Sequence, residues 1–291
     1  MTYRQLWLKG TGLLEKAQVP ESRLDAELLL EHVCGIDKSF LLAHGEEDCP
    51  ADLERAYDDV LKKRAERIPL QQITGCQDFM GLTFRVNENV LIPRQDTEIL
   101  VEEILKDLHG GSRILDLCTG SGCILISLLR YSNDCSGVGS DLSSKALQVA
   151  RQNAQELIPE KDWEFLEGDL FENVTGKFDL LVSNPPYIAS AEVEKLMPEV
   201  LEHEPRMALD GREDGLYFYR RILEECPRFL YGGAQVFFEI GFDQGEAVKQ
   251  LMKEAGFQDI QVIPDYAGLD RVVCGNLGFS HSGKDGLSGE L

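Results

Sequence analysis

The apolar positions of the chain change pattern along its length, and from residue 97 onward two patterns alternate. Short continuous apolar runs predict buried strands, and longer stretches with apolar residues every third or fourth position predict helices. The predicted order is helix 98–108, strand 113–117, helix 123–131, strand 136–141, helix 145–157, strands 163–166 and 178–183, helix 215–229, strand 234–240, helix 244–255, and strands near 260 and 271. This alternation predicts an α/β fold with a mostly parallel sheet flanked by helices.

Residues 1–75 have helical periodicity instead, interrupted by Pro20, Gly35 and Pro50. The apolar positions that show it best are Leu24, Leu28, Leu29, Leu30, Leu53, Tyr57, Val60 and Leu61. We therefore expect a small helical domain over residues 1–75.

Between these regions the pattern is that of strands. Leu82, Phe84 and Val86 alternate with polar neighbours, residues 87–89 have turn composition, and residues 90–92 form a second apolar run. The sequence predicts a β-hairpin linker over residues 76–92 and the α/β domain over residues 93–278. Residues 279–291 are rich in Gly and Ser, and we expect them to form a flexible tail.

Charge narrows the class of partner. The 291 residues include 51 acidic and 29 basic side chains, a formal net charge of −22. Such a charge repels a phosphate backbone, so we expect no direct nucleic-acid partner and favour a basic one. Taken alone, the acidity is equally well explained by solubility.

The eight cysteines form no Cys-x-x-Cys pair and no grouping with zinc-ligand spacing. We expect them to be reduced thiols, and we expect no metal. The N-terminus lacks the apolar stretch of a signal peptide, and nowhere are eighteen consecutive residues apolar. The sequence therefore predicts a cytoplasmic protein with no membrane partner. We also expect a monomer.

The most informative motif is Asn184-Pro185-Pro186-Tyr187, directly after the predicted strand 178–183. Open α/β sheets bind ligands at the carboxyl ends of their strands. The prolines stiffen the turn and leave carbonyls free to accept, Asn184 adds an acceptor, and Tyr187 adds a flat face. These groups suit a planar NH2 group, although an isolated motif of this kind is as often a simple proline turn.

A second loop, Cys118-Thr119-Gly120-Ser121-Gly122, lies between predicted strand 113–117 and the following helix. Its glycines allow the backbone to approach a ligand. Asp141 ends the next strand, placed to bind a ribose diol. Leu125 stands where a dinucleotide motif needs its third glycine, and no Gly-Lys-Ser/Thr follows, so both phosphate-binding motifs are disfavoured.

Two more carboxylates point to the chemistry of the ligand. Asp116 would repel a diphosphate but attract an ammonium or sulfonium group, the charges of S-adenosylmethionine; alternatively it caps the loop. Asp169, in Gly168-Asp169-Leu170-Phe171 after strand 163–166, can reach the same crevice beside adenine, or can be a solvated turn residue.

These motifs, in this order, resemble the class I methyltransferases with a Rossmann-like sheet that act on amino nitrogens. Residues 91–101, 204–211 and 238–241 narrow the resemblance to the protein-(glutamine-N5) methyltransferases of peptide chain release factors, the HemK/PrmC family. The resemblance covers nearly the whole chain up to about Cys274. It implies methyl transfer from S-adenosylmethionine, which becomes S-adenosylhomocysteine, to the glutamine of the Gly-Gly-Gln motif.

Site residues carried over from the family follow its motifs. Thr119, Gly120, Ser121, Gly122, Asp141, Leu170 and Asn184 would line the cofactor, and residues 184–187, including Pro185 and Pro186, would hold the glutamine amide. Cys118 replaces a common glycine, Gln95-Asp96 replace Pro-Glu, and Leu170 replaces a tryptophan found over the adenine in some members. Phe171 is the expected substitute for that tryptophan.

In the expected mechanism Asn184 Oδ1 and the Pro185 carbonyl accept the two N–H bonds of the amide, and Tyr187 stacks on it, without a strong base. The helical domain would hold the body of the release factor, or would merely cover the sheet. Two other classes compete. An adenine-N6 nucleic-acid methyltransferase could use the same motif but would need a basic face. A non-enzymatic acidic binding protein would not need an intact cofactor loop.

Overall fold

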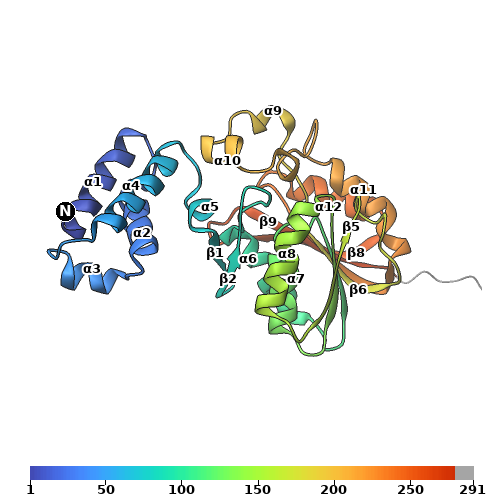
Figure 1. The fold of residues 1–291 in the computed structure, drawn as a ribbon. Coiled ribbons are helices and arrows are strands. Elements are labelled where there is room, and N and C mark those ends of the chain that lie inside the picture. Colours follow the sequence, from blue (N-terminus) through green and yellow to red (C-terminus); the bar gives the residue numbers. More distant parts are fainter. Residues whose placement is uncertain (279–291) are drawn as a thin grey trace, which may run out of the picture. The chain divides into compact units, whose positions relative to one another are not determined.

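The computed structural model describes residues 1–278, so the predicted tail lies outside the described residues. The chain divides into two compact units (Figure 1). We call Met1–Ile92 together with Ala191–Arg206 the helical unit, and Pro93–Ser190 together with the chain from Met207 onward the sheet unit. The second segment of the helical unit comes from the middle of the chain, which the sequence pattern did not predict.

Five helices make up most of the helical unit. They are α1 (Tyr3–Lys16), α2 (Ser22–Cys34), α3 (Lys38–His44), α4 (Ala51–Ala65) and α5 (Leu70–Thr74). Leu29, Leu30, Tyr57 and Leu61 are fully buried in their shared core. Leu24 is 47% exposed, because one side of α2 faces away from that core.

The hairpin lies earlier than the apolar pattern predicted. β1 (Cys76–Phe79) pairs antiparallel with β2 (Leu82–Arg85), and Met80 and Gly81 both have left-handed φ angles, of 50° and 69°. Two such residues form the tight turn that matches strand twist. The prediction of a strand at residues 90–92 is wrong, because Val90 and Ile92 are buried but no residue of this segment pairs in a sheet. The apolar composition of residues 90–92 reflects burial and not strand pairing.

The inserted segment of the helical unit contains α10 (Pro198–His203) and most of α9 (Ser190–Val193). Glu199 of α10 is only 7% exposed. Arg64 Nη2 donates to its Oε1 at 3.0 Å, and Arg67 contributes two hydrogen bonds, at 2.7 Å to Oε1 and 2.5 Å to Oε2. Gln72 Nε2 also donates to the His203 carbonyl at 2.7 Å. The insertion is therefore attached by buried charge pairs to α4 and the residues after it.

The sheet unit is built on seven strands in the order β5-β4-β3-β6-β7-β9-β8. Their bounds are β3 (Arg113–Leu117), β4 (Ser136–Asp141), β5 (Asp162–Glu167), β6 (Phe178–Ser183), β7 (Leu230–Glu239), β8 (Phe257–Pro264) and β9 (Asp270–Leu277). The first five strands in this order are parallel, and β9 and β8 are antiparallel to their neighbours. The order reverses direction between β3 and β6, where ligands bind in such sheets.

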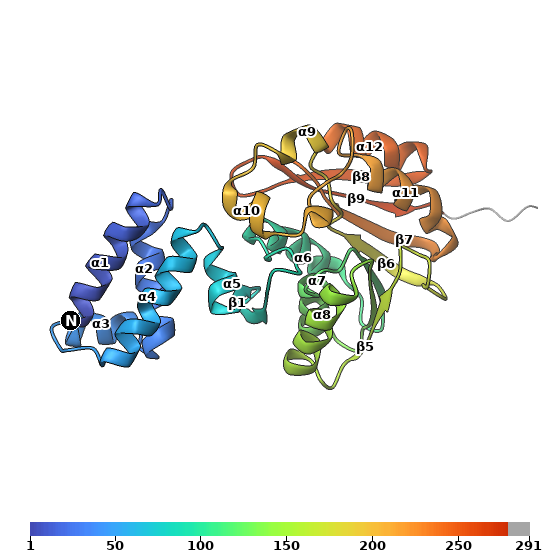
Figure 2. The same cartoon turned by 45° about the horizontal axis from the view of Figure 1, so that its top comes forward.

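Helices cover both faces of this sheet (Figure 2). On one side lie α6 (Gln95–Asp107), α7 (Cys123–Tyr131) and α8 (Ser144–Leu157); on the other lie α11 (Tyr217–Glu225) and α12 (Gly245–Glu254). Leu115, Leu181 and Val236 share a buried cluster with α11 and α12. Ile114 and Leu180, one position earlier, are equally buried, as expected for strands covered on both faces. The predicted α/β fold is confirmed.

The segment from 206 to 229 also contains two short 3-10 helices, η1 (Arg206–Ala208) and η2 (Cys226–Arg228). The helix predicted over residues 215–229 thus consists of α11 followed by η2. Pro227 prevents α11 from continuing, because proline lacks the N–H that the next turn needs.

Candidate active site

The loops after β3, β4, β5 and β6 all leave the sheet at one edge. Leu117 of β3 pairs with Ser183 of β6 and with Ser140 of β4, and Ser140 pairs with Leu166 of β5. Because these strands are parallel and in register, the residues that follow them emerge together. The structure thereby brings the predicted loops at 118–122, 141, 168–171 and 184–187 to adjacent positions.

The loop after β3 is shaped by three left-handed residues. Cys118, Gly120 and Gly122 have φ angles of 61°, 56° and 79°. A Cβ on Gly122 would meet Ile126 Cδ1 at 3.0 Å, whereas one on Gly120 would meet nothing within 4 Å. The backbone at Gly120 therefore borders open space that a ligand could enter. At Cys118 the left-handed conformation costs about 1–2 kcal/mol relative to glycine, so this departure from the family pattern introduces strain.

The side chains of Thr119 and Ser121 point into the protein and are 4% and 2% exposed. Thr119 Oγ1 donates to Asp116 Oδ2 at 2.6 Å, and the Ser121 carbonyl accepts from Asn153 Nδ2 at 3.0 Å. Both side chains are therefore buried beneath the loop, and Ser121 Oγ has no hydrogen-bond partner among the described residues.

Asp116 is fully buried beneath this loop. Its Oδ1 has no hydrogen-bond partner among the described residues. Burial raises the pKa of its carboxyl to about 7, against the effect of the Thr119 hydrogen bond. A buried carboxyl with an unused oxygen next to an open backbone fits a cationic ligand better than an anionic one.

Asp141 ends β4 and supports the same loop. Its Oδ2 accepts from the Gly120 backbone N–H at 2.9 Å, and its Oδ1 accepts from the Ser143 N–H at 2.9 Å. Burial raises the pKa of Asp141, and these hydrogen bonds oppose the rise. Each carboxylate oxygen can accept a further hydrogen bond, so the Asp141 side chain can support the loop at residues 118–122 and bind a diol at the same time.

The loop after β5 is arranged differently from the prediction. Asp169 accepts two hydrogen bonds from Arg221 Nη1, at 2.9 and 3.0 Å. Leu170 has a left-handed φ of 56°, and its carbonyl accepts from Ser140 Oγ at 2.7 Å. Phe171 is 3% exposed and stacks on Phe229 with ring centroids 4.7 Å apart. The structure does not support Phe171 as the aromatic cover of an adenine, because its ring belongs to the core.

The motif at residues 184–187 follows β6, with both prolines buried. Asn184 Nδ2 donates to Thr97 Oγ1 of α6 at 3.4 Å. The Tyr187 hydroxyl donates to Glu239 Oε1 at the end of β7, also at 3.4 Å. Burial, and then the nearby Glu239 carboxylate, raise the pKa of Tyr187, so its hydroxyl stays protonated.

Two glycines hold the backbone of this motif. A Cβ on Gly211 would lie 2.8 Å from the Pro186 carbonyl oxygen, and one on Gly215 would lie 2.3 Å from that of Tyr187. Gln244 Nε2 also donates to the Tyr187 carbonyl at 2.9 Å. The backbone at Gly211 and Gly215 therefore packs closely against the turn at residues 184–187.

Sequence reasoning assigned no role to Thr97, Glu239, Gly211, Gly215 or Gln244. The signal was present for the first three, since they lie within the family motifs at residues 91–101, 238–241 and 204–211. Gly215 and Gln244 lie outside those motifs, and no sequence pattern singles them out.

Two negative findings apply to residues 1–278. No group of three or more His, Cys, Asp or Glu side chains in this range is arranged to hold a metal ion. No helix in the same range has both the length and the apolar character needed to span a bilayer.

Comparison with known proteins assigns both parts of the chain to families. Residues 5–75 match the family model described as the PrmC N-terminal domain, and residues 94–212 match the methyltransferase small domain. A methyltransferase structure from Pyrococcus furiosus, 16% identical, covers 75% of this chain and 98% of its own with a TM-score of 0.54. This likeness concerns the fold.

Curated relatives extend over nearly the whole chain. The release factor glutamine methyltransferase of Clostridium acetobutylicum is 38% identical over 278 residues, which are 94% of this chain and 98% of that protein. That of Moorella thermoacetica is 42% identical over 275 residues, covering 93% and 97%. Identity at this level over this length shows common descent of both units, and the chain therefore belongs to the family of release factor glutamine methyltransferases.

Proposed function

We propose that the chain transfers a methyl group from S-adenosylmethionine to the side-chain nitrogen N5 of the glutamine in the Gly-Gly-Gln motif of peptide chain release factors. The observation that supports the proposal is the register of β3 with β6, in which Leu117 and Ser183, the residues just before the loops at 118–122 and 184–187, pair with each other. The first loop would hold the methyl donor and the second the amide that accepts the methyl group.

On the donor side, Asp141 would accept hydrogen bonds from the ribose hydroxyls, and the open backbone at Gly120 would border the cofactor. Asp116 would supply negative charge beneath the cationic end. Leu170 and Asp169, after β5, would lie beside the adenine. The cofactor supplies a methyl group on a positively charged sulfur, which makes that methyl electrophilic.

On the acceptor side, the task is to orient a weak nucleophile, because the lone pair of an amide nitrogen is delocalised into its carbonyl. Asn184 Oδ1 and the Pro185 carbonyl would accept its two N–H bonds and direct the nitrogen toward the methyl group. The same acceptors stabilise positive charge that develops on nitrogen during transfer. Tyr187, fixed by its hydrogen bond to Glu239, would cover the amide plane.

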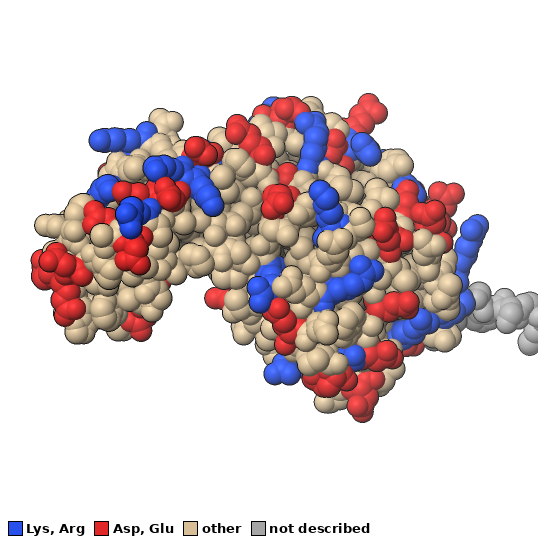
Figure 3. All heavy atoms as spheres, viewed as in Figure 1, with Lys and Arg blue, Asp and Glu red and all other residues tan. Residues whose placement is uncertain are grey.

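The experiment that tests the proposal supplies labelled S-adenosylmethionine with purified release factor, DNA and RNA in separate reactions. We expect label only on the release factor, and peptide mass spectrometry should place it on the Gly-Gly-Gln glutamine. Label on adenine in DNA or RNA would support the nucleic-acid methyltransferase instead. On the face shown in Figure 3, acidic and basic side chains are interspersed, and no continuous basic band is seen.

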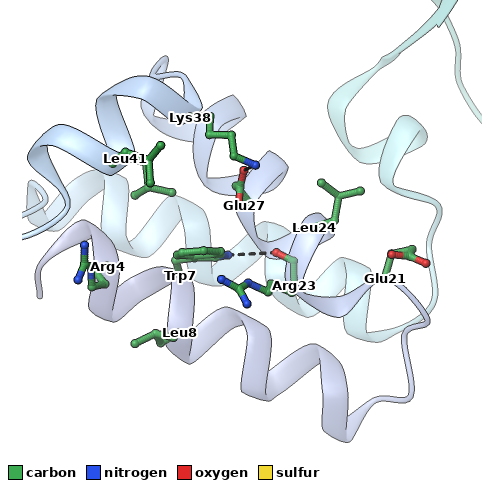
Figure 4. Close-up of a pocket in the computed structure, with 10 residues that line it drawn as sticks. Arg4, Trp7, Leu8, Glu21, Arg23, Leu24, Glu27, Lys38 and Leu41 are labelled. Carbon is green, nitrogen blue, oxygen red and sulfur yellow. Dashed lines mark hydrogen bonds and ion pairs between the residues drawn. The ribbon is translucent and has the colours of Figure 1, made fainter.

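The helical unit has a surface suited to holding the rest of the release factor. A groove of about 670 Å³ lies between α1, α2 and α3 (Figure 4). Leu8, Leu24 and Leu42 line it with exposures of 61%, 47% and 69%. Trp7 donates its Nε1–H to the Arg23 carbonyl at 3.0 Å. We propose that this groove binds an apolar surface of the release factor outside the Gly-Gly-Gln loop.

A charged substitution in the groove tests this role. Leu42→Asp should raise KM for full-length release factor about tenfold or more, while methylation of a short Gly-Gly-Gln peptide stays unchanged. Tyr131→Asp, a control on α7 at 49% exposure, should change neither value. Equal KM values for the Leu42→Asp protein and the wild type would exclude the groove. A point substitution is preferable to truncation, which would remove the partners of Glu199.

A further inference from the structure

We propose that Thr97 and Glu239 are positioning residues that fix the orientation of the Asn184 side-chain amide. This orientation makes the site select a methyl acceptor that carries N–H bonds. This inference rests on the proposed function, because it concerns how Asn184 addresses the glutamine amide. Neither side chain is exposed enough to meet a substrate, each being 2% exposed, so both would act through Asn184 and Tyr187.

Two hydrogen bonds and one unpartnered oxygen connect these groups. The Glu239 carboxylate accepts from the Tyr187 hydroxyl at Oε1, whereas its buried Oε2 has no partner among the described residues. The Thr97 hydroxyl lowers the pKa of Glu239 as a hydrogen-bond donor, and we infer that it is the group that satisfies this oxygen. Thr97 Oγ1 in turn lies 3.4 Å from Asn184 Nδ2. The connection therefore runs from the end of β7, through α6, to the side chain that would hold the substrate.

The direction of each hydrogen bond follows from the number of protons available. An ionised carboxylate can only accept, so a hydrogen bond between Thr97 and Glu239 uses the single hydroxyl proton of Thr97. The Thr97 oxygen then presents only lone pairs to Asn184. Asn184 therefore donates a hydrogen bond from its NH2 group to Thr97, and its Oδ1 is directed away from Thr97. The oxygen and nitrogen of an amide have nearly the same shape, so a fixed partner of this kind is what distinguishes the two orientations.

This orientation determines what the site can bind. With Oδ1 presented, the site offers acceptors from Asn184 and Pro185 and suits a group with two N–H donors. In the reverse orientation Asn184 would present NH2 and would repel the NH2 of glutamine. Misdirected polar groups in a buried site discriminate strongly, because they are left without partners.

The charge on Glu239 is what maintains the direction, and its surroundings allow that charge to change near neutral pH. Burial raises the pKa of Glu239 to about 7. The Thr97 and Tyr187 hydroxyls and Arg271 favour the ionised form, and Asp96 opposes it. The other groups that face it are Cys123 of α7, whose thiol stays neutral because burial raises its pKa to about 12, and Tyr219 of α11, which donates to the Glu239 backbone carbonyl at 2.7 Å.

A proton on Glu239 would remove the constraint. The carboxyl could then donate to Thr97, and the Thr97 hydroxyl could donate to Asn184, which would turn its amide. Turnover should therefore fall as the pH decreases through about 7. The ionised form is populated above that pKa and lost below it, so the direction of the effect is fixed.

The test compares variants that preserve shape. S-adenosylmethionine is kept saturating at every pH, so that any effect of Asp116 on its binding does not enter the rate. Under these conditions wild-type kcat should rise with pH and level off above about 7. Thr97→Val, which removes the hydroxyl at nearly constant volume, should lower kcat about 100-fold, whereas Thr97→Ser should retain most of it. Glu239→Gln, which can donate, should lower kcat similarly and abolish the midpoint near pH 7.

Tyr219→Phe is the matched control, because its hydroxyl contacts the same residue through the backbone and not the carboxylate. It should keep the midpoint of the wild-type profile. Equal turnover of Thr97→Val and Thr97→Ser, or an unchanged midpoint in Glu239→Gln, would overturn the relay while leaving the proposed function intact. Failure of the wild type to methylate release factor would overturn the proposed function itself. Donor binding by each variant, measured by calorimetry, shows that the sheet unit is folded.

Discussion

Binding of S-adenosylmethionine should weaken as the pH falls through about 7, and Asp116 is the group responsible. Its carboxyl is fully buried beneath the loop at residues 118–122, and burial raises its pKa to about 7. A cation placed beside the loop favours the ionised form and lowers that pKa. Binding is then coupled to loss of a proton, so affinity is full above pH 7 and declines below it.

The size of the effect follows from the charge interaction. Two unit charges about 6 Å apart in an effective dielectric constant of about 20 attract by about 2.8 kcal/mol, or about two pKa units. The pKa of Asp116 would then fall from about 7 to about 5 on binding. With these values the dissociation constant at about pH 5.5 exceeds that at about pH 8 by about 20-fold.

Isothermal titration calorimetry across this pH range measures the effect. Asp116→Asn, neutral at every pH, should bind weakly and with no dependence on pH. Glu239→Gln is a matched control, since its carboxyl has the same raised pKa but belongs to the acceptor side, and it should keep the wild-type slope. A wild-type affinity that does not change with pH, or an Asp116→Asn protein that retains the slope, would refute the reasoning.

Four further outcomes are expected. In the ligand-free protein, Asp116→Asn should raise the melting temperature at pH 8 but not at pH 4, because a raised carboxyl pKa lowers stability as the pH increases from the unfolded to the folded value. Asn184→Ala should lower kcat about 100-fold or more while the donor dissociation constant, measured by calorimetry, changes little. Asp141→Ala should raise that dissociation constant at least about tenfold, as loss of a charge-assisted hydrogen bond requires; an unchanged value would limit Asp141 to supporting the loop. Glu199→Ala should destabilise the protein by about 3 kcal/mol in denaturant unfolding, since it removes a buried carboxylate from Arg67 and leaves the buried Arg64 with Asp25 alone, whereas Glu192→Ala, in an exposed pair with Lys195, should change stability by less than about 0.5 kcal/mol.

The sequence predicted those parts of the fold that local patterns encode. Strands 113–117, 136–141 and 178–183 and helix 123–131 have the predicted bounds, because continuous apolar runs and helical periodicity are properties of neighbouring residues. The meeting of the loops at residues 118–122 and 184–187 also followed, since parallel strands bring their carboxyl ends to one edge.

What the sequence did not predict depends on residues distant in the chain. Whether Phe171 faces a ligand or the core is decided by Phe229, and the role of Glu239 becomes apparent only when Thr97 and Tyr187 lie beside it. The displaced hairpin had a local cause, but two left-handed residues at 80 and 81 are not evident when one of them is methionine.

The composition of the helical unit has a consequence for how the protein is made. Residues 1–92 leave the ribosome long before residues 191–206. Three hydrogen bonds of the helical unit can therefore form only later: Arg67 with Glu199, Gln72 with His203, and the Ile92 N–H with Glu204. At about 5–20 residues per second, that interval lasts about 6–26 seconds. During this interval the whole Rossmann-type half of the sheet, through β6, is synthesised. The helical unit, which emerges first, is thus completed only after much of the sheet unit has been synthesised. The two compact parts therefore cannot fold to completion one after the other on the nascent chain.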